Sequence, residues 1–205
     1  MESVNLKVLE CGIATRALPG ESESGDRHLV EGYHNGALVA VVDGLGHGTE
    51  AAEAAKISVR TLEQHAAETV ISLLKRCHAS LSATRGVVMS LASFNAPEGT
   101  MTWLGVGNVE GILAHSDSRI SPDREGLLLR GGVVGSQLPG LRASVLPVFH
   151  GDLLIFATDG ITNDFTGEIN FSDHPQGIAD RIMERHNKGT DDALVLVVRY
   201  LGYTR

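Results

Sequence analysis

The stretch Ala37-Leu38-Val39-Ala40-Val41-Val42-Asp43-Gly44-Leu45-Gly46-His47-Gly48 combines three patterns within twelve residues. Its first six residues form a continuous apolar run, which is typical of a strand buried on both faces. Asp43 follows this run directly, and the glycines after it let the backbone turn sharply and approach other groups closely. Helical spacing of apolar residues then extends over residues 49–66. We therefore expect a buried strand, a glycine-rich loop and a helix, with Asp43 at the edge of the core.

Similar patterns predict the other elements of the fold. His34-Asn35-Gly36 indicates the turn of a β-hairpin. The remaining elements do not alternate between strand and helix, which argues against a doubly wound parallel sheet. We expect an α+β fold, a sandwich of sheets with helices packed outside. Strands are predicted over residues 6–17, 37–42, 86–94, 101–106, 111–115, 126–129, 143–149, 152–157 and 193–200, and helices over 49–66, 68–82 and 175–186.

Length and charge narrow the class of protein. The chain has 205 residues, and we expect one domain over residues 1–205. Its net charge is -8, from 25 acidic and 17 basic residues, which argues against sequence-independent binding to nucleic acid or to an anionic membrane. No signal peptide and no membrane span are recognisable. We expect a cytoplasmic protein in which Cys11 and Cys77 are reduced.

Several acidic residues lie where predicted strands begin or end. Carboxylates at the edge of an apolar core are costly unless their charge is compensated, and a divalent cation compensates it directly. Such hard oxygen ligands suit Mg²⁺ or Mn²⁺ better than Zn²⁺. Asp-Gly is also a common turn dipeptide, so spacing alone leaves both a metal site and plain turns open. The acids and their neighbours are Asp26, Asp43-Gly44, Asp159-Gly160 and Asp191-Asp192.

The glycine-rich loop has other interpretations as well. Backbone N–H groups at the start of a helix can bind phosphate. The loop nevertheless lacks both the Lys-Ser/Thr of a P-loop and the glycine spacing of a dinucleotide site, so we expect no nucleotide site. His47 is compatible with a role in the site and equally with a surface position. Arg16 could bind a phosphate group, although an ordinary salt bridge also explains it.

Five motifs, taken together and in order, resemble those of the PPM family of metal-dependent serine/threonine phosphatases. Each is weak alone, but together they span nearly the whole chain. The Asp43 motif, completed by Glu50-Ala51-Ala52, resembles the small bacterial branch of this family, and within it a phosphatase of the stressosome. The motifs are Ser24-Gly25-Asp26, Val41-Val42-Asp43-Gly44-Leu45-Gly46-His47-Gly48, Gly105-Val106-Gly107-Asn108, Ala157-Thr158-Asp159-Gly160-Ile161 and Thr190-Asp191-Asp192-Ala193.

The resemblance implies a four-layer fold, in which two antiparallel sheets are flanked by helices, and a site for two Mn²⁺ or Mg²⁺ ions. Asp43 would bridge the two ions, and the Gly44 carbonyl would complete the shell of one. Asp159 and Asp191 would hold the second ion. Asp192 competes with Asp191 for this role, and the first acid of the pair matches the family position.

The resemblance also implies a catalytic mechanism and a class of substrate. Asp26 and Asp43 would be the catalytic residues, with Asp26 orienting a metal-bound water. A bridging hydroxide would attack phosphorus in line, without a covalent phosphoenzyme. The implied substrates are phosphoserine and phosphothreonine on stressosome proteins with STAS domains. The alternatives are a phosphatase of a single-domain anti-anti-sigma factor and a catalytically inactive metal-binding regulatory module.

Two departures from the family pattern bear on substrate binding. No segment corresponds to the mobile flap of larger members, so we expect an open site and no third metal ion. The arginine that clamps phosphate in eukaryotic members has no clear match, because Arg16 is displaced from the corresponding position.

Overall fold

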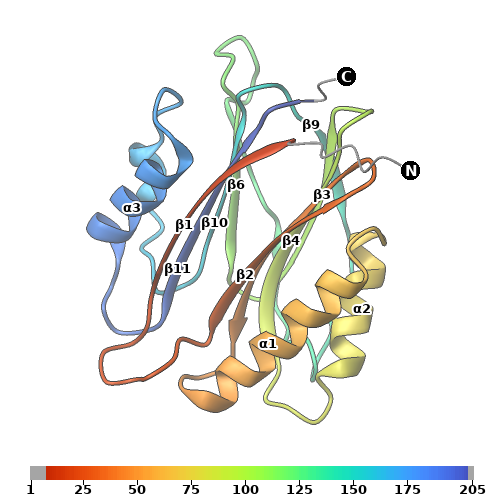
Figure 1. Cartoon of the computed structure of the whole chain (residues 1–205), viewed down its shortest axis with the longest axis vertical. Coiled ribbons are helices and arrows are strands. Elements are labelled where there is room, and N and C mark those ends of the chain that lie inside the picture. The colour runs from red at the N-terminus through yellow and green to blue at the C-terminus, as the bar shows by residue number, and fades with distance from the viewer. Residues whose placement is uncertain (1–7, 203–205) are drawn as a thin grey trace.

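Two β-sheets lie face to face in the computed structural model, which describes residues 8–202 (Figure 1). All strand pairs are antiparallel except β5 with β8. Sheet 1 has the order β1 (Leu9–Arg16), β11 (Ala193–Tyr200), β10 (Leu153–Ala157), β6 (Glu110–Ala114) and β7 (Arg124–Gly126). Sheet 2 has the order β2 (Asp26–Tyr33), β3 (Gly36–Gly44), β4 (Val87–Asn95), β5 (Thr100–Val106) and β8 (Leu129–Arg130), and β9 (Ser144–Pro147) also pairs with β5.

Helices cover the outer faces of both sheets (Figure 1). The helices α1 (Thr49–Gln64) and α2 (Val70–Ser80) pack on sheet 2, and α3 (Pro175–His186) packs on sheet 1. A third apolar core lies between the sheets and includes Phe94, Trp103 and Phe156. Three cores between four layers confirm the predicted α+β sandwich with helices outside. In the described part of the chain, no helix has the length and apolar character needed to cross a membrane.

Most predicted elements are confirmed to within a few residues, and α3 and β11 have the predicted bounds. The single strand predicted over residues 126–129 is wrong. The chain there forms β7 in sheet 1 and then β8 in sheet 2, so it crosses from one sheet to the other. The apolar run misled the prediction because Leu127 packs against the inner core while Leu128 is 72% exposed. The short 3₁₀ helix η1 (Phe165–Glu168) was not predicted, and residues 6–7 of the first predicted strand lie outside the described residues.

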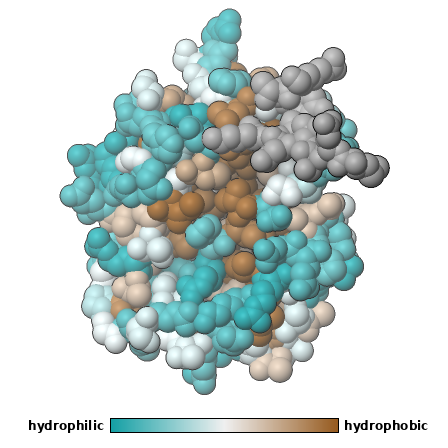
Figure 2. All heavy atoms as spheres, viewed as in Figure 1, coloured by the Kyte–Doolittle hydropathy of each residue, from teal (hydrophilic) through white to brown (hydrophobic). Residues whose placement is uncertain are grey.

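The two sheets meet differently on their two sides. The strands β1 and β2 are the edges on one side, and Figure 2 shows apolar surface gathered between them. Cys11, Ile13 and Val30 belong to these strands and are only partly buried against the inner core. On the other side, the chain passes within a few residues from β7 at the edge of sheet 1 to β8 at the edge of sheet 2.

One glutamine of α3 binds the outer edge of β1. The Gln176 side chain accepts the Ile13 N–H at 3.0 Å and donates to the Ile13 carbonyl at 2.8 Å. Gly12 allows this close approach of α3, because a Cβ at that position would lie 2.1 Å from the Gln176 backbone nitrogen. The amide thus replaces a neighbouring strand at one point of an otherwise open edge.

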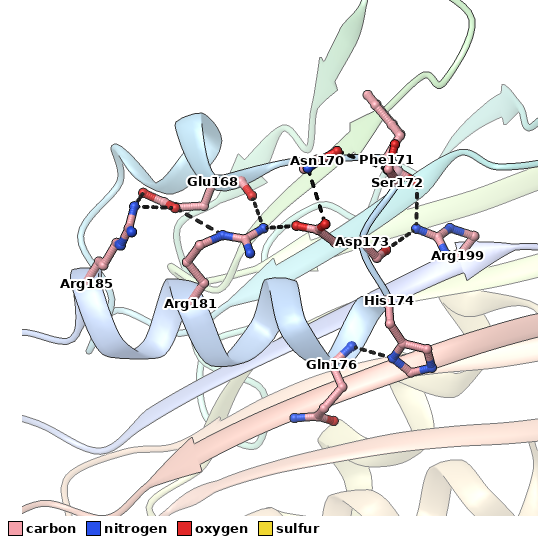
Figure 3. Close-up of polar contacts among 10 residues, drawn as sticks. All are labelled: Glu168, Asn170, Phe171, Ser172, Asp173, His174, Gln176, Arg181, Arg185 and Arg199. Atoms are coloured by element: carbon pink, nitrogen blue, oxygen red, sulfur yellow. Dashed lines mark hydrogen bonds and ion pairs between the residues drawn. The ribbon is translucent and has the colours of Figure 1, made fainter.

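Charged side chains fix the segment that leads into α3 (Figure 3). Arg181 donates to the Glu168 carbonyl at 2.9 Å and to the Asp173 carboxylate at 2.7 Å. Arg199 on β11 donates to the Phe171 carbonyl at 2.9 Å. Because these contacts join η1, α3 and β11, the start of α3 and its Gln176 are held in place relative to sheet 1.

Candidate metal centre

Two of the predicted acids lie opposite each other in the hairpin of β2 and β3. Asp26 begins β2, Asp43 lies near the end of β3, and the two are register partners. Directly opposite residues of an antiparallel pair project on the same face, with their Cβ atoms about 5 Å apart. Asp26 is buried at 2% exposure, and Asp43 is partly buried. The hairpin therefore brings two carboxylates together at one end of sheet 2.

The glycines after Asp43 let α1 pack closely against this end of the sheet. A Cβ on Gly44 would lie 2.2 Å from the Ala51 carbonyl oxygen, so only glycine fits there. The Gly44 N–H donates to the Gly25 carbonyl at 3.2 Å. Gly46 and Gly48 have φ of 86° and 76°, a backbone region that favours glycine. This conformation explains why the motif repeats glycine before the helix begins at Thr49.

Sheet 1 contributes two further acids from neighbouring strands. Asp159 follows β10, and its carboxylate accepts the side-chain N–H of Asn108 at 2.7 Å. Asp191 precedes β11, is exposed, and lines the same cavity as Asp43 and Asp159. This cavity has a volume of about 410 Å³. Acids that are far apart in sequence thus converge where the ends of the two sheets meet.

Asp192 does not line this cavity, and its carboxylate accepts hydrogen bonds from backbone N–H groups. Its two carboxylate oxygens accept the N–H groups of Leu18 at 2.8 Å and Gly25 at 2.6 Å. The side chain is 4% exposed and does not line the cavity. A Cβ on Gly160 would lie 2.0 Å from the Asp192 carbonyl oxygen, so the Asp159-Gly160 turn packs directly on this residue.

Thr158 connects the two sheets inside the site. Its hydroxyl donates to the Asp26 carboxylate at 2.7 Å and accepts the Leu194 N–H at 2.8 Å. Sequence reasoning gave Thr158 no role, although it directly precedes Asp159. A hydroxyl beside an acid at the end of a buried strand is a weak signal, because threonine is common in strands. The contact to Asp26 becomes visible only when the sheets are packed.

Burial and neighbouring carboxylates raise the pKa of Asp43 and of Asp26. Burial, followed by the charges of Asp26, Asp159, Asp191 and Asp192, raises the pKa of Asp43 to about 9. Burial raises the pKa of Asp26 to about 7, and the Thr158 hydrogen bond opposes this shift only in part. A fold that gathers carboxylates in this way carries a cost that a bound cation removes.

The donor set fits a hard divalent cation. It consists of carboxylate oxygens, and no cysteine lines the cavity within the described residues. Within residues 8–202, no three His, Cys, Asp or Glu side chains form a complete cluster for a metal ion. Mg²⁺ normally keeps several waters and binds one or two carboxylates, so an open set of acids suits it better than a closed cage.

The outcome for the other candidates is mixed. His47 lines the cavity, and its Nδ1 lies 2.6 Å from the Glu21 carboxylate. Arg16 lines a separate depression beside Asp180 and Glu184, so it does not reach the site. Both cysteines are free, as expected, and burial raises the pKa of the Cys77 thiol to about 12.

Comparison with known proteins identifies the class and then the family. The four-layer fold is that of PPM-type phosphatases, as the sequence motifs predicted. The family of Stage II sporulation protein E (SpoIIE) matches residues 34–201, and the chain belongs to this family. The expectation of a protein serine/threonine phosphatase is thereby confirmed at the level of the family.

Individual relatives support the expected likeness to a small bacterial phosphatase. Phosphoserine phosphatase RsbX of Bacillus subtilis (strain 168) is 34% identical over 99 residues, which are 48% of this chain and 49% of RsbX. The match thus spans about half the length of this curated relative. A chain from a structure of the bacterial stressosome, described as a modular system adapted to control secondary messenger signaling, has a TM-score of 0.86 at 30% identity, covering 93% of this chain and 99% of that one. RsbX in complex with magnesium has a TM-score of 0.83 at 21% identity, covering 97% and 98%.

Proposed function

We propose that this protein is a Mn²⁺- or Mg²⁺-dependent phosphatase, a single domain that removes phosphate from phosphoserine or phosphothreonine of other proteins. The observation that carries the proposal is the cavity where Asp43, Asp159 and Asp191 converge beside the buried Asp26. Two strands of sheet 2 hold Asp26 and Asp43, and two loops of sheet 1 hold Asp159 and Asp191. These acids repel one another unless a cation lies between them. Membership of the SpoIIE family agrees with this chemistry.

The proposed ligands follow from the positions of the donors. Asp43 would be shared by two ions, because it lines the same cavity as Asp159 and Asp191 and is also the register partner of Asp26. The Gly44 carbonyl would be a ligand of one ion, and Asp159 and Asp191 of the other. Asp191 is preferred to Asp192, because both Asp192 oxygens already accept backbone N–H groups.

The chain's own residues would prepare the reaction. When bound, the ions would neutralise the charge of the phosphoryl group and lower the pKa of a water bound to them toward neutrality. The hydrogen bond from Thr158 fixes the Asp26 carboxylate. Its other oxygen can accept a hydrogen bond from an attacking water and so orient that water toward phosphorus. Asn108 holds the Asp159 carboxylate in one orientation. No side chain in this arrangement is required as a covalent nucleophile.

We further propose that the substrates are phosphorylated STAS-domain proteins of a stressosome, and that the protein acts in the cytoplasm. Support comes from two relatives, one a phosphoserine phosphatase and the other a chain from a stressosome structure. The metal ions would let an acidic protein of net charge -8 bind an anionic phosphoprotein.

A phosphate-release assay tests this proposal. The protein is incubated with a phosphorylated STAS-domain protein and Mn²⁺, with and without EDTA, beside Asp43→Asn and the control Asp123→Asn. Asp123 is an exposed acid before β7, so its change makes the same charge difference away from the cavity. We expect release by the wild type and the control in Mn²⁺ only, and none by Asp43→Asn. Release that survives EDTA would refute the metal-dependent mechanism, and no release from any phosphoprotein would favour an inactive regulatory module.

A further inference from the structure

A second cavity adjoins the metal centre and shares part of its wall. It has a volume of about 630 Å³ and lies between the crossing segment 124–129 and residues 158–166. Gly107, Asn108 and Asp159 line both cavities, so the second opens directly beside the first. Its floor includes apolar side chains of Ile112, Leu127 and Leu129. If a phosphorylated side chain of a substrate protein reaches the acids, the substrate residues around it would lie next to this cavity.

Lys188 lies on the wall of this second cavity, and both its backbone and its side chain are fixed. Its backbone N–H donates to the Gly160 carbonyl at 2.9 Å. Its Nζ donates to the Asp159 carbonyl oxygen at 2.6 Å. A lysine ammonium has three N–H donors, and this contact uses one of them. The side chain is exposed to the cavity, which leaves the other two donors accessible to a ligand.

The charge of Lys188 is unusual in these surroundings. Among the described residues that line the two cavities, Lys188 and Arg124 are the only lysine or arginine side chains. Arg124 belongs to β7 on the crossing segment, whereas Lys188 contacts the residue whose carboxylate lies in the metal centre. Of these two side chains, Lys188 is thus the one with a direct hydrogen bond to a residue of the metal centre.

We propose that Lys188 Nζ binds a phosphoryl oxygen of the phosphomonoester dianion, and that the cavity beside it holds the segment carrying the phosphorylated residue. This inference rests on the proposed function, because it supplies the phosphate-binding cation that Arg16 does not provide. A charge-assisted hydrogen bond to a phosphate oxygen is worth about 1.5–3 kcal/mol, which corresponds to an affinity change of roughly 10-fold to 150-fold.

Binding of inorganic phosphate tests the inference without turnover. Titration calorimetry in Mg²⁺ compares the wild type with Lys188→Met, Lys188→Arg and the control Lys75→Met. Lys75 is exposed on α2, on the outer face of sheet 2, and loses the same charge. We expect Lys188→Met to weaken phosphate binding at least 10-fold, Lys188→Arg to retain most of it, and Lys75→Met to change it less than 2-fold. Unchanged binding in Lys188→Met would overturn the inference.

Two further measurements separate phosphate binding from a structural role and from the proposed function. If Lys188 only held the Asp159 loop, Lys188→Met would lower Mg²⁺ affinity and the melting temperature, and Lys188→Arg would not restore phosphate binding; that result overturns the inference. With a phosphoserine peptide, we expect Lys188→Met to raise KM by 10-fold or more. Phosphate binding that depends on Lys188 in a protein without phosphatase activity would uphold this inference and refute the proposed function. Phosphatase activity that Lys188→Met leaves unchanged would uphold the proposed function and refute this inference.

Discussion

Replacement of Asp43 by asparagine should change protein stability in opposite directions without and with divalent metal. In the metal-free protein, burial and neighbouring acids raise the pKa of Asp43 from 3.8 to about 9. A carboxyl whose pKa is higher in the folded than in the unfolded state destabilises the fold as pH rises above the unfolded value. Asparagine has nearly the same shape and no charge, so it removes this repulsion.

The size of the effect follows from the hairpin register. Asp26 and Asp43 are directly opposite, which places their Cβ atoms about 5 Å apart. Two unit charges at that separation repel by about 3 kcal/mol at an effective dielectric constant of 20. A change of 1 kcal/mol shifts the melting temperature of a domain of this size by about 2–4 °C. We therefore expect Asp43→Asn to melt about 6–12 °C above the wild type in EDTA at pH 9.

Metal should reverse the order of the two proteins. A ligand at 1,000 times its dissociation constant stabilises a folded protein by about 4.1 kcal/mol, which exceeds the repulsion of about 3 kcal/mol. Asp43→Asn should lose most of this gain because it lacks the shared ligand. Differential scanning calorimetry in EDTA and in Mn²⁺ measures both effects, with Asp123→Asn as the control. The reasoning is refuted if Asp43→Asn melts below the wild type in EDTA, or if Mn²⁺ stabilises both proteins equally.

Three other predictions concern the fold around the site. Gln176→Leu should lower the unfolding free energy by about 1–3 kcal/mol, because it removes both hydrogen bonds to Ile13, and an unchanged urea midpoint would contradict this. Gly44→Ala should abolish Mn²⁺ binding and lower the melting temperature, because its Cβ would lie 2.2 Å from an α1 carbonyl oxygen; calorimetry showing normal Mn²⁺ affinity would refute it. The metal-free protein should lose stability as pH rises from about 4 to 9. The unfolded chain releases its aspartate protons near pH 4. The folded chain retains them on Asp26 up to a pH of about 7 and on Asp43 up to a pH of about 9. Urea unfolding in EDTA at several pH values checks this trend, and rising stability across that range would count against it.

Local patterns were sufficient to predict most of the fold. The apolar run before Asp43 and the helical spacing after it correspond to β3 and α1, because burial on both faces of a strand and on one face of a helix leaves different periods in sequence. The segment from Arg124 to Arg130 shows the limit of this reasoning. Whether a short apolar run stays in one sheet or crosses to another depends on partners that are distant in sequence.

The acidic residues of the candidate site could be picked out from the sequence, whereas the hydrogen bonds that hold them could not. Asp43 and Asp159 precede glycine after buried strands, a local signal that the structure places in one cavity. The resemblance to the family already favoured Asp191 over Asp192, and the structure adds a physical reason, because both Asp192 oxygens accept backbone N–H groups more than 160 residues away. Lys188 carries no sequence signal, because its relevance comes only from its contact with the Asp159 carbonyl.

The central claim is that Asp43 is shared by two divalent ions at the point where the two sheets meet. Electron paramagnetic resonance of Mn²⁺, combined with a count of bound ions per chain, tests this claim most directly. The account predicts two ions per chain with a spin-coupled spectrum in the wild type, and loss of the coupled spectrum in Asp43→Asn but not in Asp123→Asn. A coupled spectrum that persists in Asp43→Asn, or a wild type that binds no Mn²⁺, would contradict it.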